Sequence, residues 1–486
     1  MTDADLIVVG CGPVGVVLAG LAARRGLRVV ALDREVDIFP LPRAAHFDHE
    51  IMRVFQELGI ADELSTVVVP NIGMDFLSAD REVLMSMRAS ARTTSGWHSS
   101  NLFHQPGLER ALRAAALRLG AELRLGIAVD RMDDTGDVVT AHLSNGTSLT
   151  APYLVGCDGA RSTIRRQLGI TMDDLQFEEP WLVLDIVLRD GVDPPSELAL
   201  QVCDPRRPHT LIPMPSPRFR FEFMLLAGET AEEMDTPDRA RQLMSAWIDP
   251  DLVEIERSAV YTFHGLIADE WRRGRILIAG DAAHQTPPFL GQGMCAGIRD
   301  AANLVWKVER IVRHGAPDAL LDTYQPEREP QVRAIVGAAV GFGRVICTTD
   351  PAVAAERDAG MLAARAGGSG PATEAPLPPM ERGPLVLEGG GAPAVQGVVD
   401  GVRVDDLVGP RFAVVARHHA LLDGTAGDWW TMFGAEMLTA DEHPSLEPTL
   451  DAADADVVVV RPDRHVFVAG ATLDVPPLET RTLLGA

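Results

Sequence analysis

The residues best suited to chemistry lie in one stretch, 275–300, which reads RILIAGDAAHQTPPFLGQGMCAGIRD. Its apolar start predicts a buried strand that ends just before Asp281, so this carboxylate should face a crevice at the strand's carboxyl end. Pro287-Pro288 stiffen the following loop, and Gly291-Gln292-Gly293 let backbone amides approach a flat ligand. From Met294 the apolar residues recur at helical spacing, and the N-terminus of such a helix favours negative charge. The stretch therefore predicts a site for a flat ligand that gathers negative charge.

A second element with chemical potential is the glycine-rich turn Gly10-Cys11-Gly12-Pro13-Val14-Gly15. An apolar strand at 6–9 precedes it, a helix to Arg25 follows it, and the next strand ends in Asp33. Glycines in this order let a pyrophosphate approach the helix N-terminus, and an acid about 20 residues further on can accept hydrogen bonds from a ribose. The order predicts a dinucleotide site, and a purely structural βαβ unit is the alternative.

The third element is Asp158-Gly159, which closely follows an apolar strand at 153–156. Asp158 should leave this strand at the same crevice edge as Asp281, because parallel strands end together. Arg161 then supplies positive charge for the phosphates of a nicotinamide cofactor. The chain has one GxGxxG motif, so we expect NAD(P)H to bind in a surface groove rather than in a domain of its own.

Together these motifs resemble the FAD-dependent aromatic hydroxylases, the group A flavoprotein monooxygenases with the p-hydroxybenzoate hydroxylase fold. Within that family the segments around Cys203 and Gly291 are most similar to the 3-(3-hydroxyphenyl)propionate hydroxylase-like branch. The resemblance implies an α/β fold, with a Rossmann-type FAD-binding domain, an inserted mixed or antiparallel-sheet substrate domain and a small thioredoxin-like C-terminal domain. It implies FAD and NAD(P)H as cofactors and no metal.

The resemblance also implies which residues contact the cofactor and the substrate. Gln105 inherits the role of the family's FAD-contacting glutamine, and Cys295 stands where much of the family has asparagine, so the ring contact there is expected from the backbone. The candidate catalytic residues are His46, Asp48 and Pro288. The segment 45–50 should open a helix that reaches Gly59, and a solvated first turn, in which Asp48 complements the helix dipole, is the alternative to catalysis for His46 and Asp48. The candidate cofactor-binding residues are Gly10, Gly12, Pro13, Gly15, Asp33, Arg34, Arg43, Gln105, Val129, Asp158, Gly159, Asp281, Pro288, Gly291, Gly293, Met294 and Cys295.

The activity implied by the resemblance is hydroxylation of a phenolic or otherwise electron-rich ring. NAD(P)H would reduce FAD, and the reduced flavin would react with O2 to give the C4a-hydroperoxide that attacks the ring. A 3-(3-hydroxyphenyl)propionate-like compound is one candidate substrate. Two alternatives stay open: a tailoring hydroxylase of an aromatic natural product, and a flavin-binding reductase or redox sensor without hydroxylase activity.

Composition narrows the range of partners and compartments. The net charge of −25 over 486 residues argues against nucleic acid, which requires clustered basic residues. Five widely spaced cysteines without a CxxC pair predict neither disulfides nor a zinc site and fit a cytoplasmic protein. The apolar residues 6–23 carry spaced glycines and are assigned to the nucleotide-binding unit rather than to a membrane segment.

Changes in pattern along the chain predict its domain organisation. Alternating strands after 170 indicate a sheet that covers the substrate, and its arginines, Arg206, Arg207, Arg218 and Arg220, either meet an anionic substrate or lie in solvent. The C-terminal domain contains no cysteine, so its expected role is structural or dimer-forming. The predicted limits are 1–70, 101–170 and 271–362 for the FAD-binding domain, 71–100 and 171–270 for the substrate domain, 363–393 for a linker and 394–486 for the C-terminal domain.

Overall fold

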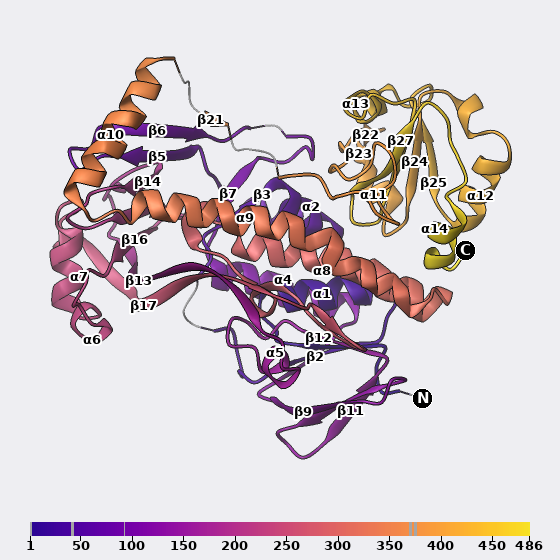
Figure 1. Ribbon diagram of the computed structural model, residues 1–486, viewed down its shortest axis with the longest axis horizontal. Coiled ribbons are helices and arrows are strands. Elements are labelled where there is room, and N and C mark those ends of the chain that lie inside the picture. The colour runs from indigo at the N-terminus through magenta and orange to yellow at the C-terminus, as the bar shows by residue number, and fades with distance from the viewer. Residues whose placement is uncertain (1, 40–42, 92, 369–371, 374–376) are drawn as a thin grey trace.

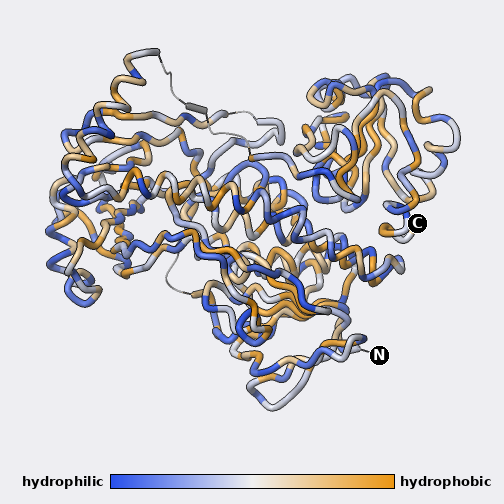
Figure 2. Tube along the Cα trace, viewed as in Figure 1, coloured by the Kyte–Doolittle hydropathy of each residue, from blue (hydrophilic) through white to orange (hydrophobic). Residues whose placement is uncertain are grey.

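The computed structural model describes residues 2–39, 43–91, 93–368, 372–373 and 377–486 (Figure 1). A six-stranded sheet forms the nucleotide-binding core, and its strands are parallel except at one edge. Short apolar runs form the four central strands, which are buried on both faces, and these runs are orange in Figure 2. In spatial order the six strands are β18 (Arg272–Arg273), β19 (Ile276–Ile278), β12 (Tyr153–Gly156), β1 (Leu6–Val9), β2 (Val29–Asp33) and β8 (Glu122–Leu125).

Long helices cover this sheet and connect it to the rest of the molecule (Figure 1). Helix α1 (Pro13–Arg24) packs against both α4 (Gln105–Leu119) and α8 (Gly293–His314). Helix α9 (Tyr324–Ile346) crosses from the nucleotide-binding core to the second large sheet, where α10 (Pro351–Ala366) continues the chain. The N-termini of α1 and α8 therefore start at the carboxyl edge of the six-stranded sheet, as the sequence predicts.

A nine-stranded mixed sheet forms the second part of the molecule. One face carries alternate apolar residues, such as Leu184 and Phe221, that pack with helices α6 (Ala231–Met234) and α7 (Pro237–Met244). The opposite face carries the residues between them, including Asp185 and Arg220. In spatial order the strands are β20 (His284–Gln285), β17 (Val253–Ala268), β13 (Met172–Leu188), β16 (Arg218–Met224), β15 (His209–Pro213), β14 (Ala199–Val202), β5 (Gly73–Leu77), β6 (Val83–Arg88) and β21 (Ala372–Thr373).

Smaller elements join the two sheets, and one of them differs from the prediction. The segment His46–Asp48, expected at the start of a helix, forms the short strand β3, and α2 (His49–Glu57) begins only after it. The reason is pairing with β7 (Ser100–Leu102), which itself pairs with β4 (Val69–Pro70). An antiparallel sheet of β9 (Val129–Asp134), β10 (Val139–Leu143) and β11 (Ser148–Ala151), the helices α3 (Ala61–Leu64) and α5 (Thr163–Gln167) and short 3-10 turns complete this region.

The C-terminal part has a sheet of its own, separated from the others in Figure 1. The strand order β25-β24-β26-β27, with β24 and β25 parallel and the other pairs antiparallel, is that of a thioredoxin-like fold. Its elements are β24 (Ala413–Ala416), α12 (Thr425–Phe433), β25 (Glu436–Thr439), α13 (Glu447–Ala452), β26 (Val457–Val460), β27 (Val466–Gly470) and α14 (Leu478–Leu484), preceded by β22 (Val398–Val399), β23 (Val402–Arg403) and α11 (Val404–Val408).

The predicted linker, 363–393, begins inside α10, and residues 369–371 and 374–376 of it lie outside the described residues. The domain limits stay a prediction. Among the residues that the structure describes, no single helix has the length and apolar composition needed to cross a membrane. One pair, Asp318–Ile346 with Pro351–Ala366, reaches that composition together but is bent by 114°.

Candidate active site

A cavity of about 1290 Å³ lies where the glycine-rich turn, the start of α8 and the nine-stranded sheet meet. Ligand sites for drug-sized molecules typically measure roughly 300–1,000 Å³, so this space can hold a dinucleotide together with a small second ligand. Residues from all three predicted motifs line it. The predicted site residues in its wall are Gly12, Pro13, Arg43, His46, Asp48, Gln105, Gly159, Asp281, Pro288, Gly291, Gly293 and Met294.

The glycine-rich turn has the shape needed to hold a pyrophosphate. A Cβ atom at Gly10 would lie 2.4 Å from the Cys157 carbonyl oxygen, and one at Gly15 would lie 1.9 Å from the Gly10 carbonyl oxygen. A Cβ at Gly12 would meet no atom within 4 Å, so this position opens onto the cavity. Asp33 accepts a 2.6 Å hydrogen bond from the Cys11 amide and thereby fixes the turn. The open space lies in front of the N-terminus of α1, which favours an anion.

A second group of polar residues lies along another part of the cavity wall. The Arg43 guanidinium is 3.2 Å from the Asp281 carboxylate. The side-chain oxygen of Gln105 accepts hydrogen bonds from the amides of Arg43 (2.7 Å) and Ala44 (2.8 Å), and its nitrogen donates to Glu109 (2.6 Å). Gln105 therefore fixes the backbone that carries the Arg43 side chain. Paired charges and partly exposed carboxylate oxygens suit the polyhydroxyl chain of a dinucleotide.

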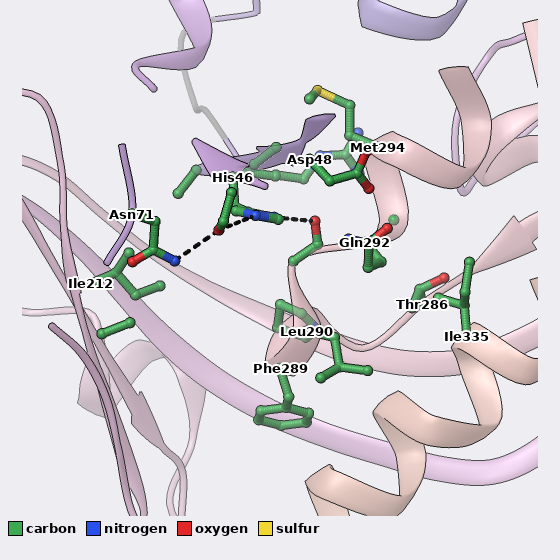
Figure 3. A pocket seen from close by; sticks show the side chains of 18 of the residues that line it. His46, Asp48, Asn71, Ile212, Thr286, Phe289, Leu290, Gln292, Met294 and Ile335 are labelled. Carbon is green, nitrogen blue, oxygen red and sulfur yellow. Dashed lines mark hydrogen bonds between the residues drawn. The ribbon is translucent and has the colours of Figure 1, made fainter. Parts of the chain in front are cut away.

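The loop before α8 is held by a buried chain of hydrogen bonds, shown in Figure 3. His46 Nδ1 lies 3.3 Å from the Gly291 carbonyl oxygen and Nε2 lies 2.7 Å from Ser100 Oγ, which also accepts from the Asn71 amide at 3.0 Å. Because a carbonyl oxygen only accepts, Nδ1 carries the proton, and the Ser100 hydroxyl donates to Nε2. Burial lowers the pKa of His46, which keeps the imidazole neutral. Both ring nitrogens are thus engaged, which favours a positioning role over proton transfer.

Asp48 is held in place from two sides. One carboxylate oxygen caps α2 by accepting from the amides of Glu50 (3.1 Å) and Ile51 (3.2 Å). The other accepts from Arg299 on α8 at 2.6 Å, and Arg299 also contacts Glu50 at 2.8 Å. Burial acts to raise the pKa of Asp48, but the Arg299 charge outweighs it and lowers this pKa to about 2. Asp48 thus caps α2 as a buried, ionised carboxylate and not in a solvated turn, and it has no proton to give at neutral pH. Its catalytic role stays a prediction.

Comparison with known proteins identifies the family. The profile of the FAD binding domain family matches residues 3–339. The chain belongs to this family. A probable NADH-specific resorcinol 4-hydroxylase of Rhodococcus jostii (strain RHA1) is 38% identical over 95% of this chain and 91% of that protein. A 3-(3-hydroxy-phenyl)propionate/3-hydroxycinnamic acid hydroxylase of Mycobacterium sp. (strain JLS) is 34% identical over 99% of this chain and 92% of that protein.

The fold is shared with solved structures of the same kind. The crystal structure of aklavinone-11 hydroxylase with FAD and aklavinone covers 100% of both chains with a TM-score of 0.82 at 24% identity. The predicted fold class is therefore confirmed. The family match and the relatives also confirm the assignment to the FAD-dependent aromatic hydroxylases, flavin-dependent aromatic-ring monooxygenases that use FAD and a nicotinamide donor.

Several predicted site residues of this hydroxylase lie away from the cavity wall. Asp158 holds the start of α5, whose N-cap is Ser162, by accepting from the Ser162 hydroxyl (2.5 Å) and the Thr163 amide (2.7 Å). Cys295 is completely buried, and its sulfur lies 3.8 Å from the Gly291 carbonyl oxygen. Val129 is buried in β9, and the exposed Arg34 pairs with its neighbour Glu35. Their contacts with FAD stay a prediction.

Sequence reasoning missed two buried residues that support the site of the hydroxylase. For Arg299, described above, the only sign of a role in the sequence is its charge, which lies inside a mostly apolar helix. Asp300, next to it, accepts from the Gly280 amide (3.0 Å), from His284 (2.7 Å) and from Arg328 (3.0 Å). Asp300 thus fixes the backbone directly before Asp281, which is the kind of supporting contact that a sequence pattern does not reveal.

The four arginines suggested for an anionic substrate are placed differently from one another. The guanidinium groups of Arg206, Arg207 and Arg218 pair with Asp204, Glu229 and Glu256 respectively, and none of these three arginines lines the cavity. Arg220 is buried in the cavity wall of the hydroxylase, where it binds Asp185 at 2.6 Å.

Proposed function

We propose that the protein is an NADH-dependent monooxygenase that hydroxylates a small phenol with one aromatic ring, using O2. The observation that carries this proposal is the single cavity shared by the open Gly12 turn, the Arg43–Asp281 pair and the start of α8. The named activities of the two relatives, on resorcinol and on a hydroxyphenylpropionate, support a one-ring phenol. The printed NADH specificity of the first supports NADH as the donor.

The residues present fit FAD, and each part of the site has a distinct task. The space at Gly12 and the N-terminus of α1 would take the pyrophosphate, with Asp33 toward the ribose. Arg43, Gln105 and Asp281 would hold the middle of the cofactor. When bound, FAD supplies the redox chemistry and activates O2.

The chain's own contribution is orientation, charge stabilisation and exclusion of water. Gly293 and Met294 at the start of α8 line the cavity, where their amides would stabilise negative charge on the ring. His46 fixes this loop through Gly291, and Pro288 and Phe289 close part of the wall. No side chain with a free basic nitrogen is needed at the reacting carbon, because the substrate phenol is already electron-rich.

The test is a turnover experiment with the purified holoprotein, NADH, ¹⁸O2 and a panel of one-ring phenols, with multi-ring phenols for comparison. We expect at least one phenol to accelerate NADH oxidation and to yield a product that carries one ¹⁸O atom. NADH oxidation that no phenol stimulates, without labelled product, would instead indicate a reductase or redox sensor. Labelling only with multi-ring substrates would favour a tailoring hydroxylase of natural products.

Two further expectations accompany this proposal. All five cysteines are free, which suits the reducing cytoplasm that we propose as the location. A homodimer is proposed from the exposed apolar side chains of the C-terminal domain, Met432 and Leu478, and the molar mass in solution would test it.

A further inference from the structure

A row of three buried charges crosses the cavity face of the nine-stranded sheet. Asp185 on β13 lies opposite Arg220 on β16 and opposite Arg257 on β17. One Asp185 oxygen lies 2.6 Å from Arg220 Nε, and the other lies 3.2 Å from Arg257 Nε. All three residues are at most 5% exposed. Two guanidinium groups therefore share a single carboxylate inside the protein.

A break in strand register brings Arg257 to this face. Val253 and Ile255 of β17 pack in the apolar core on the other side of the sheet, so uninterrupted alternation would send residue 257 there as well. The register shifts between Asp185 and Ile186, which leaves one extra residue, Glu256, on β17. After this bulge Val260 returns to the apolar core, while Arg257 and Tyr261 line the cavity. Bulges commonly re-aim side chains next to functional sites.

Arg257 and Tyr261 lack the hydrogen bonds that buried polar groups require. Among the described residues, none accepts a hydrogen bond from the Arg257 guanidinium nitrogens, and none pairs with the Tyr261 hydroxyl. Arg220 offers a contrast, since it donates twice to Asp185 and once to the Arg43 carbonyl oxygen. A buried donor without an acceptor destabilises the protein, and a charged donor does so more strongly. The two groups thus point to a missing acceptor.

The charges around Arg257 and Tyr261 favour a negatively charged group as the acceptor of their hydrogen bonds. Glu222 is the other acidic residue in this part of the wall, 3.8 Å from Arg220, and burial raises the pKa of its carboxyl group. The raised pKa favours the neutral form of Glu222, so two arginines share one carboxylate, that of Asp185. A carboxylate would restore the balance and has the lone pairs to accept from both Arg257 and Tyr261.

We propose that Arg257, assisted by the Tyr261 hydroxyl, binds the carboxylate of a phenolic acid and makes the enzyme prefer such acids over uncharged phenols. This inference rests on the proposed function, because the same cavity must also accept the phenol ring. It selects a hydroxyphenylpropionate-like compound over resorcinol as the type of substrate.

The test compares two ligands that differ only in the charged end, 3-(3-hydroxyphenyl)propionate and 3-propylphenol. Their binding to the oxidised holoprotein is measured by calorimetry and by the change in flavin absorbance, and kcat/KM is measured by product formation. Hydrogen bonds to charged groups contribute roughly 1.5–3 kcal/mol, which corresponds to a preference for the acid of roughly 10- to 100-fold. The wild-type protein should show this preference in both binding and kcat/KM.

Variants at Arg257 separate recognition from folding. Arg257→Gln should lose at least about tenfold in affinity for the acid and keep its affinity for 3-propylphenol within about threefold, while Arg257→Lys keeps part of the preference. Tyr261→Phe should weaken binding of the acid by a smaller factor. Arg206→Gln replaces an exposed arginine that pairs with Asp204 outside the cavity, and this control should behave as wild type.

The outcomes distinguish this inference from the proposed function. A wild-type protein that binds both ligands equally, or prefers 3-propylphenol, overturns the inference, as does an unchanged preference in Arg257→Gln. If Arg257→Gln loses its flavin, the comparison of Arg257→Lys and Tyr261→Phe decides by the same criterion. If the protein binds phenols with the predicted preference but never hydroxylates them, the proposed function is refuted and the inference about Arg257 is still supported.

Discussion

Gly10 and Gly12 lie in the same turn, yet the structure assigns them opposite constraints. Gly10 has a φ of +103° and no room for a side chain, because the Cys157 carbonyl oxygen is in the way. Gly12 has an ordinary φ of −73° and open space in front of it. Protein packing explains the first glycine, whereas only a ligand explains the second.

Gly12→Ala should therefore leave the apoprotein as stable as wild type but weaken FAD binding. The methyl group fills the space into which the pyrophosphate must fit, so we expect the dissociation constant of FAD to rise by roughly tenfold or more, equivalent to about 1.4 kcal/mol. Flavin fluorescence titration and denaturant unfolding of the apoprotein measure the two effects. Gly10→Ala is the counterpart and should destabilise the apoprotein itself. Unaltered FAD affinity in Gly12→Ala would contradict the site.

Arg299 neutralises two buried carboxylates, those of Asp48 and Glu50. Arg299→Met removes the positive charge but leaves both acids in place, and an orphaned buried charge typically costs about 3–5 kcal/mol. We expect a loss of this order in the free energy of unfolding, measured with denaturant. Arg333→Met, in which a half-exposed arginine loses Asp173 and Glu329, should cost no more than about 1 kcal/mol. Equal losses in the two variants would refute the buried role of Arg299.

At the level of elements, the loop that leads into α8 depends on the fit between Gly291 and His46. Gly291 has a φ of +64°, and a Cβ atom there would lie 2.8 Å from His46 Nδ1. Gly315, which ends the same helix with a φ of +73°, has nothing within 4 Å of its Cβ position. The two glycines share a left-handed backbone conformation, and they differ in whether a side chain there would meet another residue.

Alanine substitutions at these two positions isolate the contact. Gly315→Ala should cost about 1 kcal/mol of stability through the left-handed backbone alone and leave FAD affinity unchanged. Gly291→Ala carries the same cost and also displaces His46, so it should weaken FAD binding several-fold and shift the flavin absorbance spectrum. Unfolding and flavin titration of both proteins provide the comparison. A normal spectrum and affinity in Gly291→Ala would mean that the loop tolerates a shift of His46.

The helices and strands that follow from a local residue pattern could be predicted from the sequence. Those that depend on pairing with a strand far along the chain could not. The strands and helices around Gly12 and Asp281 follow from apolar runs and glycine positions, and the structure has them. His46–Asp48 became a strand because of its partner β7, more than fifty positions along the chain, which no local pattern reveals. The bulge at Glu256 reverses the facing of Arg257 for the same reason. Asp158 shows why a motif alone does not identify a ligand contact. The same Asp-Gly motif can hold the start of a helix, as it does here, or contact a ligand.

At the scale of the whole molecule, the C-terminal domain is fixed to the nucleotide-binding core by apolar and charged contacts. Trp306 of α8 packs with Phe412 and other aromatic residues of the C-terminal domain. Beside it, Glu327 of α9 accepts from Lys307 (3.0 Å) and from Arg461 of the C-terminal domain (2.7 Å). The linker that leads into this domain reaches the cavity, because Pro393 lies in the cavity wall. The domain itself contains no cysteine for redox chemistry, so its contribution is to anchor this linker beside the site.

Lys307 gives this interface a distinctive pH dependence. It is the single lysine of the chain and is completely buried. Burial, reinforced by Arg461 and opposed by Glu327, lowers the pKa of Lys307 from 10.5 to about 8. Between these two values the unfolded chain holds a proton that the folded protein has released, so the contribution of Lys307 to stability rises as the pH rises from 8 to 10.5. The full change is on the order of 3 kcal/mol.

Lys307→Met should remove the pH-dependent contribution of Lys307 to stability and leave Glu327 paired with Arg461. The difference in the free energy of unfolding between wild type and variant, measured with denaturant at intervals from pH 7.5 to 10.5, should change in favour of wild type by up to about 1.4 kcal/mol per pH unit. Cysteine thiols of the unfolded chain also titrate in this range, whereas burial raises the pKa of Cys11 and Cys203 to about 12 in the folded protein. This effect is common to both proteins and cancels in the difference. No second lysine can contribute. Two parallel pH profiles would show that Lys307 keeps an ordinary pKa and that the interface is more hydrated than its packing indicates.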